Sequence, residues 1–394
     1  RQMCIRDSYY NGPVPQGEPV QVRTDRTVNF NWIFALPHPA LDANCFSVVW
    51  TGSVVMPRTM DGCIGLSTQD SMRLYVDDKL LIDGWGKDKS ADQALDFHFE
   101  AGRTYKIRIE FVNDRRGARV IFGYSAGREN FPAAVEAARK ADVAILCMGD
   151  NEETSGENFD RTDLNLPGRQ LELVQAVYAT GTPVVLVLQS GRPVTANWEN
   201  DHLSAILEAW FPGEQGGTAI AKTLFGDAAP GGRLPITFPR SVGQIPCHYS
   251  RRPGGGKRYV EMDWLPLYPF GYGLTYTTFA YRDMALSRSV IGPQDTVTVS
   301  VTVTNTGKYT GDAVPQLYVR DMFSSVVKPE RQLAAFRRLT LAPGESRRVE
   351  LTVGPKQLRT LGPDYVWRVE PGKFELQLGD NAENILLRAD LTVE

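Results

Sequence analysis

Several features that mark particular protein classes are scarce in this 394-residue sequence. Its five cysteines form no close-spaced metal motif and no dense disulfide framework. No apolar run approaches the roughly 20 residues that a membrane-spanning helix needs. The formal net charge is −3 with both signs interspersed, which offers no broad basic field for nucleic acid. We therefore expect no membrane and no nucleic-acid partner, and small polar or neutral partners fit better.

The length and composition indicate a globular protein of two or three domains. A chain of 394 residues is too long for one ordinary core, and 42% apolar with 23% charged residues argues against long disorder. The first eight residues, RQMCIRDS, do not match the pattern that follows. They resemble translated sequencing-adaptor read-through at the broken end of a gene. We therefore interpret residues 1–8 as an artefact and expect them to lie outside the fold.

Three changes of pattern divide the remaining residues. Residues 9–126 contain short alternating runs separated by turns, typical of an antiparallel β-sandwich or barrel. Residues 127–280 alternate apolar runs with helix-period segments, which predicts a layered α/β unit with a mostly parallel sheet. Residues 281–394 return to short strands and suggest an immunoglobulin-like sandwich. The predicted fold class is therefore multidomain, with one partial α/β domain between two β domains.

The α/β region has recognisable elements. Buried strands are expected over residues 143–148, 183–188 and 205–211, with Cys147 as a small buried apolar residue. Helices are expected from Phe131-Pro132 onward, from Pro167 through Tyr178 and from Gly217 through Phe225. Dense proline and glycine between residues 226 and 273 predict long surface loops.

The loop after the first of these strands is rich in carboxylates. Residues 149–168 include Glu152, Glu153, Glu157, Asp160 and Asp163, and their one cation is Arg161. Ligands of open α/β sheets bind at the carboxyl ends of strands, and a general acid needs a carboxyl whose pKa is raised. The alternative is a solvated acidic loop that caps the next helix. The residue pattern alone favours this alternative.

Motifs around this loop resemble those of family 3 glycoside hydrolases. SGENFDR (155–161), followed by LNLPG (164–168) and Gln170, is similar to the S-G-E-G-x-D-R…L-x-L-P-G-x-Q signature of that family. Matching blocks then follow in order over about 130 residues: SGRP (190–193), WFPGEQGG (210–217), FGD (225–227), PGGRLP (230–235) and PFGYGLTY (269–276). So many ordered blocks make chance similarity implausible.

The resemblance implies an identity for each domain. Residues 9–126 resemble the protective-antigen-type β-sandwich that some members carry as an insert. Residues 127–280 would be the C-terminal part of the α/β sandwich domain of the glycoside hydrolase. Residues 281–394 resemble the fibronectin type III-like domain that follows in the family.

The resemblance also implies a reaction, the hydrolysis of terminal non-reducing β-D-glycosides by a retaining two-carboxylate mechanism. Glu157, in the S-G-E block, would be the acid/base, although Asn158 stands where many members have glycine. Glu153 and then Glu152 are the fallback candidates. The nucleophile of the family lies on a (β/α)8 barrel that we do not find in these residues, so we expect the fragment alone to be inactive.

Three further residues are substrate-binding candidates by resemblance. They are Asp160, Arg161 and His248. Asp160 and Arg161 have a structural alternative, in which they pair with each other or with the loop backbone. His248 lies in the long-loop region, where surface packing is an equal alternative.

The expected substrate is a β-linked oligosaccharide or aryl glycoside, with β-glucosidase activity ranked before β-xylosidase activity. A two-carboxylate mechanism requires no metal and no organic cofactor. A homo-oligomer is compatible with the sequence, and the resemblance favours an extracellular or periplasmic location.

Other interpretations remain open. The chain could be a non-catalytic carbohydrate-binding or adhesion protein, or, from glycines 213–217, a nucleotide-binding domain. Asp77 and Asp78 form either a short hairpin turn or a calcium site, and Trp85 is either a core residue or a sugar-stacking platform. We also expect poor solubility of the α/β region, because a sheet edge would be unpaired.

Overall fold

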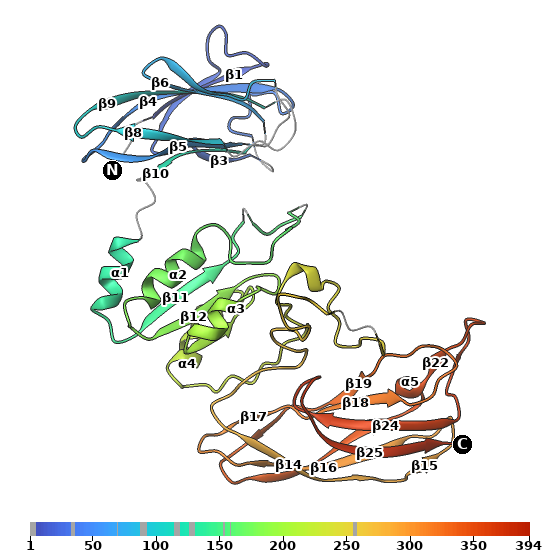
Figure 1. Cartoon of the computed structure of the whole chain (residues 1–394). Helices are drawn as coiled ribbons and strands as arrows, with labels where there is room; N and C mark the ends of the chain where they lie inside the picture. Colours follow the sequence, from blue (N-terminus) through green and yellow to red (C-terminus); the bar gives the residue numbers. More distant parts are fainter. Residues whose placement is uncertain are drawn as a thin grey trace. The chain divides into compact units, whose positions relative to one another are not determined.

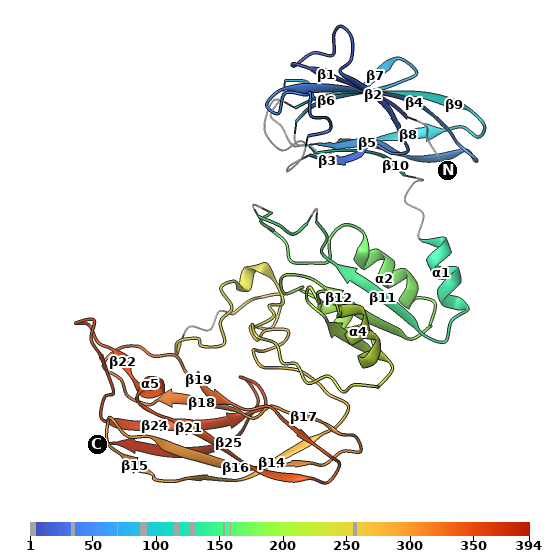
Figure 2. The same cartoon turned by 180° about the vertical axis from the view of Figure 1, so that it is seen from behind.

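The structure is a computed structural model that describes residues 5–32, 36–68, 70–86, 93–113, 119–125, 131–152, 154–157, 159–254 and 258–394. The chain divides into two compact units, Arg1–Asn130 and Phe131–Glu394 (Figures 1 and 2). Each unit has its own hydrophobic core. Over the described part as a whole, strands outnumber helices, so the prediction of several domains with β structure predominating is confirmed.

The first unit consists of two antiparallel sheets around one core. Its strands are β1 (Ile5–Asn11), β2 (Gln21–Asp25), β3 (Asn29–Asn31), β4 (Phe46–Val55), β5 (Met60–Thr68), β6 (Ser71–Val76), β7 (Lys79–Asp83), β8 (Gln93–Phe99), β9 (Thr104–Asn113) and β10 (Arg119–Ser125). One sheet has the order β2-β1-β4-β9-β6-β7 and the other the order β3-β10-β5-β8. Alternate residues of both sheets meet in a single apolar cluster.

An aromatic stack forms the centre of this cluster. The ring of Trp32 lies parallel to that of Trp50, with centroids 6.3 Å apart, and to that of Phe30 at 5.0 Å. Phe111 meets both tryptophans at a tilt. Aromatic pairs of this kind contribute about 0.5–1.5 kcal/mol each beyond the area they bury. The stack therefore holds the two sheets together.

Replacing Trp50 with alanine should strongly destabilise the first unit. Trp50 is only 1% exposed, and removing a large buried aromatic side chain costs about 3–5 kcal/mol of unfolding free energy. Native-state hydrogen exchange of the β4 and β9 amides would measure the loss. Trp85→Ala is the matched control, because Trp85 is half-buried outside the core, and it should cost about 1 kcal/mol or less. Equal losses in the two variants would contradict the prediction.

Residues 5–8 belong to this unit, so the expectation that the whole segment 1–8 lies outside the fold is wrong from Ile5 onward. Strand β1 lies between β2 and β4, and its alternation turns Ile5, Asp7 and Tyr9 inward. Asp7 Oδ2 accepts a hydrogen bond from the Tyr9 hydroxyl at 3.3 Å, whereas Oδ1 has no partner among the described residues. Burial, together with the neighbouring Asp25, raises the pKa of Asp7 to about 7. The adaptor origin of the segment stays a prediction.

The turn between β6 and β7 lies at Asp77 and Asp78, as the hairpin interpretation requires. Both residues have positive φ, 50° and 62°, as the tight hairpin turns need. The Asp77 carboxylate accepts hydrogen bonds from the Lys106 backbone N–H at 2.9 Å and from Arg103 at 3.0 Å, which lowers the pKa of Asp77. These bonds favour a structural role for Asp77 over a calcium ligand.

Trp85 follows β7 and lies outside the core cluster. The guanidinium of Arg73 covers one face of its ring at 4.8 Å. The core interpretation of Trp85 is therefore wrong, and the sugar-stacking alternative stays untested.

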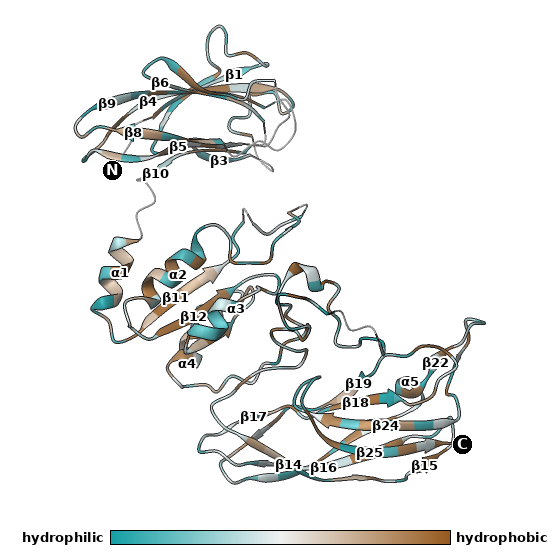
Figure 3. Cartoon of the chain, in the orientation of Figure 1, coloured by the Kyte–Doolittle hydropathy of each residue, from teal (hydrophilic) through white to brown (hydrophobic). Residues whose placement is uncertain are grey.

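The second unit begins with a three-stranded parallel sheet. Its strands are β11 (Ala144–Gly149), β12 (Val184–Gln189) and β13 (Ala205–Glu208), in that spatial order. Four helices accompany them: α1 (Pro132–Arg139), α2 (Gln170–Tyr178), α3 (Asn197–His202) and α4 (Gly216–Leu224). Leu186 and Leu188 of β12 pack with Val174 of α2 in one buried cluster. Figure 3 shows the hydrophobic colour of β11 and β12 beside the helices.

Two predicted boundaries differ from the structure. The third strand ends at Glu208 rather than at residue 211, because Trp210 adopts a left-handed φ of 53° that no strand can continue through. Helix α2 begins at Gln170 rather than at Pro167, and the positive φ of Gly168, 60°, explains the delay.

Strand β11 is less covered than its continuous apolar run predicts. Within the described part of the chain it lies at the sheet edge, and Ile145 is 44% exposed on the face opposite Leu146. Cys147 is also exposed, so the prediction of a buried cysteine is wrong. The reason is that helix α2 covers only one face of this strand. The expected poor solubility of this region stays a prediction.

The rest of the second unit is long loops followed by β structure. Between residues 226 and 273 the described residues form only the short helix η1 (Val242–Gln244) and a bridge between Phe238 and Tyr268. No described helix is long and apolar enough to cross a membrane.

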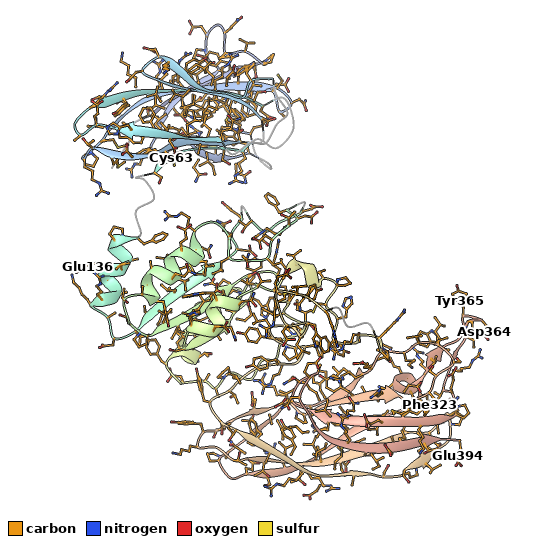
Figure 4. All side chains as sticks on the ribbon, in the orientation of Figure 1. Cys63, Glu136, Phe323, Asp364, Tyr365 and Glu394 are labelled. Atoms are coloured by element: carbon orange, nitrogen blue, oxygen red, sulfur yellow. The ribbon has the colours of Figure 1, made fainter. Side chains whose placement is uncertain are left out.

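The C-terminal β region has two main sheets around one core, with orders β14-β16-β21 and β15-β25-β24-β18-β19. Its elements are β14 (Phe279–Leu286), β15 (Val290–Ile291), β16 (Val297–Asn305), β17 (Gly311–Ala313), β18 (Gln316–Asp321), β19 (Gln332–Phe336), β20 (Leu339–Leu341), β21 (Ser346–Val353), α5 (Pro355–Leu358), β22 (Thr360–Leu361), β23 (Trp367–Arg368), β24 (Gly372–Gly379) and β25 (Ile385–Val393). Phe323 and Tyr365 are exposed at its surface (Figure 4).

Candidate functional site

The acidic loop, residues 149–168, leaves the sheet at the carboxyl end of β11, and its first residue is held firmly. The side-chain amide of Gln170 accepts a hydrogen bond from the Gly149 N–H at 2.7 Å and donates one to the Gly149 carbonyl at 2.8 Å. Gly149 has a φ of 139°, and a Cβ there would lie 2.0 Å from the Gln189 carbonyl oxygen. Only glycine fits this close approach of two strand ends. The base of the loop is therefore fixed.

Asp150 joins this loop to the ends of two strands. Its side chain is 3% exposed. One carboxylate oxygen accepts hydrogen bonds from the Thr154 hydroxyl at 3.0 Å and from Arg161 at 3.1 Å. The other accepts one from the Ser190 hydroxyl at 2.9 Å and lies 3.7 Å from Arg192 Nε. A buried carboxylate with this many donors fixes its neighbours strongly. Sequence reasoning did not single out Asp150.

Arg161 and Asp160 do not pair with each other. The Arg161 guanidinium binds Asp150 and donates a hydrogen bond to the Asn165 carbonyl at 2.9 Å. Of the two structural alternatives for Arg161, pairing with the loop backbone is therefore observed and pairing with Asp160 is wrong. Asp160 is exposed, and its carboxylate has no hydrogen bond or ion pair to any residue that the structure describes.

Glu157 occupies an exposed position on the loop. Its carboxylate makes no hydrogen bond or ion pair within the described ranges, and neither does that of Glu152. Glu153 and Asn158 lie outside the described residues. The loop thus combines a buried anchor, Asp150, with exposed carboxylates that can accept a ligand.

A second buried carboxyl lies at the same edge of the sheet, at the end of β13. Glu208 Oε1 accepts a hydrogen bond from the Trp210 N–H at 3.0 Å, and Oε2 is buried without a partner among the residues described. Burial, and to a smaller extent the charge of Asp150, raises the pKa of Glu208 to about 7. The signal in the sequence was a lone charge within the apolar run AILEAW (205–210).

The raised pKa of Glu208 predicts a pH-dependent stability. The folded pKa of about 7 lies above the ordinary value of 4.5, so the folded state binds the proton more tightly. This stabilisation is complete below about pH 4.5 and is lost as the pH rises through 7. Glu208→Gln keeps an acceptor for Trp210 and never ionises, so its Tm relative to wild type should rise between pH 5 and pH 8. A Tm difference that is constant over this range would contradict the prediction.

His248 lies in a separate place. It is exposed and lines a hollow together with Arg251, Trp264 and Glu383, and no residue of the acidic loop lines that hollow. The structure therefore brings Asp150 and Arg161 together and places His248 in other surroundings. Glu157 and Asp160 lie in the same loop as Asp150, and no described residue binds their carboxylates.

Comparisons with known families and proteins give consistent matches. The family described as "Glycosyl hydrolase family 3 C-terminal domain" matches residues 36–276, beginning inside the first unit. The "Fibronectin type III-like domain" matches residues 313–382, which confirms that prediction for the C-terminal region.

Curated relatives include both β-xylosidases and β-glucosidases. A β-xylosidase of Formosa agariphila is 45% identical over 74% of this chain and 42% of its own length. A periplasmic β-glucosidase of Salmonella typhimurium is 42% identical over 64% of this chain and 34% of its own. A β-glucosidase of Rhizobium radiobacter is 35% identical over 98% of this chain and 51% of its own.

Solved structures give the same result. The β-glucosidase of Kluyveromyces marxianus in complex with glucose has a TM-score of 0.72 at 28% identity, covering 99% of this chain and 49% of that one. A β-glucosidase of Erythrobacter marinus has a TM-score of 0.65 at 41% identity, covering 66% of this chain and 36% of that one. The chain thus spans between about a third and a half of the length of these relatives.

Proposed function

The chain belongs to glycosyl hydrolase family 3, and on this premise we propose that it forms part of an enzyme that hydrolyses terminal non-reducing β-D-glycosides. The observation that carries the proposal is the SGENFDR loop, which is anchored at the carboxyl edge of a parallel sheet and carries a glutamate that no described residue binds. Ligands of such sheets bind at this edge.

Glu157 is the proposed acid/base. It would protonate the leaving oxygen and later activate the water that releases the sugar. Its support is its position in the motif and a carboxylate that no described neighbour engages. Glu153 and Glu152 are the alternatives on the same loop.

Asp160 and Arg161 receive different roles. The exposed carboxylate of Asp160, which no described residue binds, is a candidate to accept a hydrogen bond from a sugar hydroxyl. Arg161 is already bound to Asp150 and Asn165, which supports a role in positioning the loop rather than in holding the sugar.

The nucleophile is proposed to come from outside these 394 residues. A retaining mechanism places two carboxyl groups about 5–5.5 Å apart, on opposite sides of the scissile bond. The family resemblance puts the second group on a barrel, and the greater length of the relatives leaves room for one. We therefore expect no hydrolysis by this chain alone.

The substrate is proposed to be a β-glucoside. Glucose is bound in one solved relative, and relatives called β-glucosidase cover nearly the whole chain. A β-xyloside is the second candidate, favoured by the 45% identical β-xylosidase of Formosa agariphila.

The first unit is proposed to be a protective-antigen-type insert that shapes specificity. Its two antiparallel sheets fit this type, and some relatives match nearly all of this chain while others match about two thirds. An extracellular or periplasmic location is proposed because one relative is named periplasmic.

The test is an assay of the full-length gene product against aryl β-glucosides and aryl β-xylosides. Hydrolysis of either one supports the proposal, and their ratio of kcat/KM ranks the sugars. Glycan binding without hydrolysis, unchanged in Glu157→Gln and abolished by a chelator, would instead identify a carbohydrate-binding or adhesion protein.

A further inference from the structure

The hollow beside His248 is open to solvent, and its empty volume of about 600 Å³ includes the solvent space at its mouth. Loop residues between positions 237 and 270 line most of it, and Glu383, which follows β24, completes the lining. All of these residues belong to the second unit.

Flat apolar surfaces form much of its lining. Tyr249 stacks on Phe270 with ring centroids 4.2 Å apart and an interplanar angle of 19°. Trp264 is 41% exposed, and Tyr259 and several prolines also line the hollow. Aromatic faces of this kind accept the C–H faces of a ligand, while their polar edges remain available for hydrogen bonds.

The charges around the hollow cancel. Arg251 lies over the Trp264 ring at 4.5 Å and binds Glu383 at 2.9 Å and Glu330 at 3.2 Å. Arg331 approaches Glu383 at 3.5 Å. Two guanidinium groups thus face two carboxylates, so a charged ligand would gain little net attraction and would lose its hydration. A neutral ligand fits better.

Several polar groups at the hollow have spare hydrogen-bonding capacity. The His248 ring, the Trp264 indole N–H and the Thr237 hydroxyl have no hydrogen-bond partner in the described part of the chain. The Tyr249 hydroxyl accepts from the Leu333 N–H at 3.1 Å, and its own proton remains available. Donors and acceptors around a neutral space suit a ligand that carries several hydroxyl groups.

The lining is held in place before any ligand binds. The buried side chain of Gln244 donates to the carbonyls of Trp264 at 3.1 Å and Leu265 at 3.4 Å. The Tyr259 hydroxyl donates to the Gly243 carbonyl at 2.8 Å. Preorganised walls reduce the entropy cost of binding.

We propose that this hollow is a binding site for a neutral sugar ring, separate from the acidic loop, with Trp264 as its stacking surface and His248 as a hydrogen-bonding group. Binding at this hollow depends on its own lining and not on the proposed hydrolytic activity.

The test uses the 394-residue chain and saturation-transfer NMR with D-glucose, D-xylose and, as a charged analogue, D-gluconate. We expect transfer to glucose or xylose and at least about tenfold weaker binding of gluconate. Trp264→Ala should weaken sugar binding at least about tenfold, because a tryptophan in the lining of a site often dominates binding. His248→Ala should weaken it several-fold.

Trp367→Ala is the matched control. Trp367 also carries an arginine over its ring, Arg359 at 4.4 Å, and lies on the β22–β23 hairpin, outside the hollow. It should leave sugar binding unchanged. Thermal melts identify any variant that fails to fold, and His248→Ala, at an exposed position, then decides the question. No transfer to either neutral sugar, preference for gluconate, or loss of binding in Glu157→Gln but not in the two lining variants would overturn the proposal.

Discussion

Glu157→Gln should slow hydrolysis of an aryl β-glucoside with a poor leaving group by about 10²–10⁴-fold in the full-length gene product, because general acid–base catalysis contributes that much. Glutamine preserves the size of the side chain but cannot donate the proton to the leaving oxygen. The loop itself should not change, since no described residue binds the Glu157 carboxylate. Steady-state kcat/KM against wild type measures the effect.

Azide provides a second readout. With an activated leaving group the first step needs little acid assistance, so the variant should accumulate the glycosyl-enzyme, and azide should restore turnover by replacing the water that lacks a base. A variant that is merely misfolded would show no such rescue.

Three other substitutions sharpen the assignment. Glu172→Gln is the control: Glu172 is exposed on α2 and pairs with Arg169, and we expect no more than a twofold change. Unchanged activity in Glu157→Gln with a large loss in Glu153→Gln or Glu152→Gln would move the role to that residue.

Asp150→Ala should destabilise the second unit by about 3–5 kcal/mol. Removing one partner of a buried ion pair leaves the other charges without compensation, and here Arg161 and Arg192 would both lose the carboxylate. The Ser190 and Thr154 hydroxyls would lose an acceptor as well. Urea unfolding monitored for the second unit measures the change.

Asp150→Ala should increase amide hydrogen exchange more in the acidic loop than in the parallel sheet. In Asp150→Ala the amide protons of Thr154 and Ser155 should exchange faster, whereas those of β12 should follow only the global loss of stability. Asp150→Asn keeps an acceptor and should cost less, and Asp160→Ala, at an exposed position where no described residue binds the carboxylate, is the matched control. A loss below about 1 kcal/mol in Asp150→Ala would show that the network does not hold the loop.

The sequence predicts which loop carries the chemistry, but it does not predict the residues that hold this loop. The SGENFDR motif identified the loop, and the apolar run before it identified the strand. Asp150 could not be distinguished from the other acidic residues of the loop, because its burial depends on Ser190 and Arg192, forty residues further along the chain. Spacing along the chain carries no such information.

The same limit applies to the boundaries and to burial. Nothing in the local sequence predicts the left-handed backbone of Trp210, which ends β13 before the predicted residue 211. The apolar run of β11 does not reveal that one face is exposed, because coverage depends on which other segments reach it. Residues 1–8 do not match the sequence pattern that follows them, so we did not expect a strand there. The alternate inward residues Ile5, Asp7 and Tyr9 nevertheless fit strand β1.

The side-chain amide of Gln170 takes the place of the peptide group of an adjacent strand. It makes one hydrogen bond with the N–H of Gly149 and one with the carbonyl of Gly149. Spontaneous hydrolysis of that amide would leave a carboxylate, which offers only acceptors and would repel the Gly149 carbonyl. Deamidation of Gln170 in a stored protein would therefore disturb the geometry of the acidic loop. The modified protein would be heavier by only about one dalton.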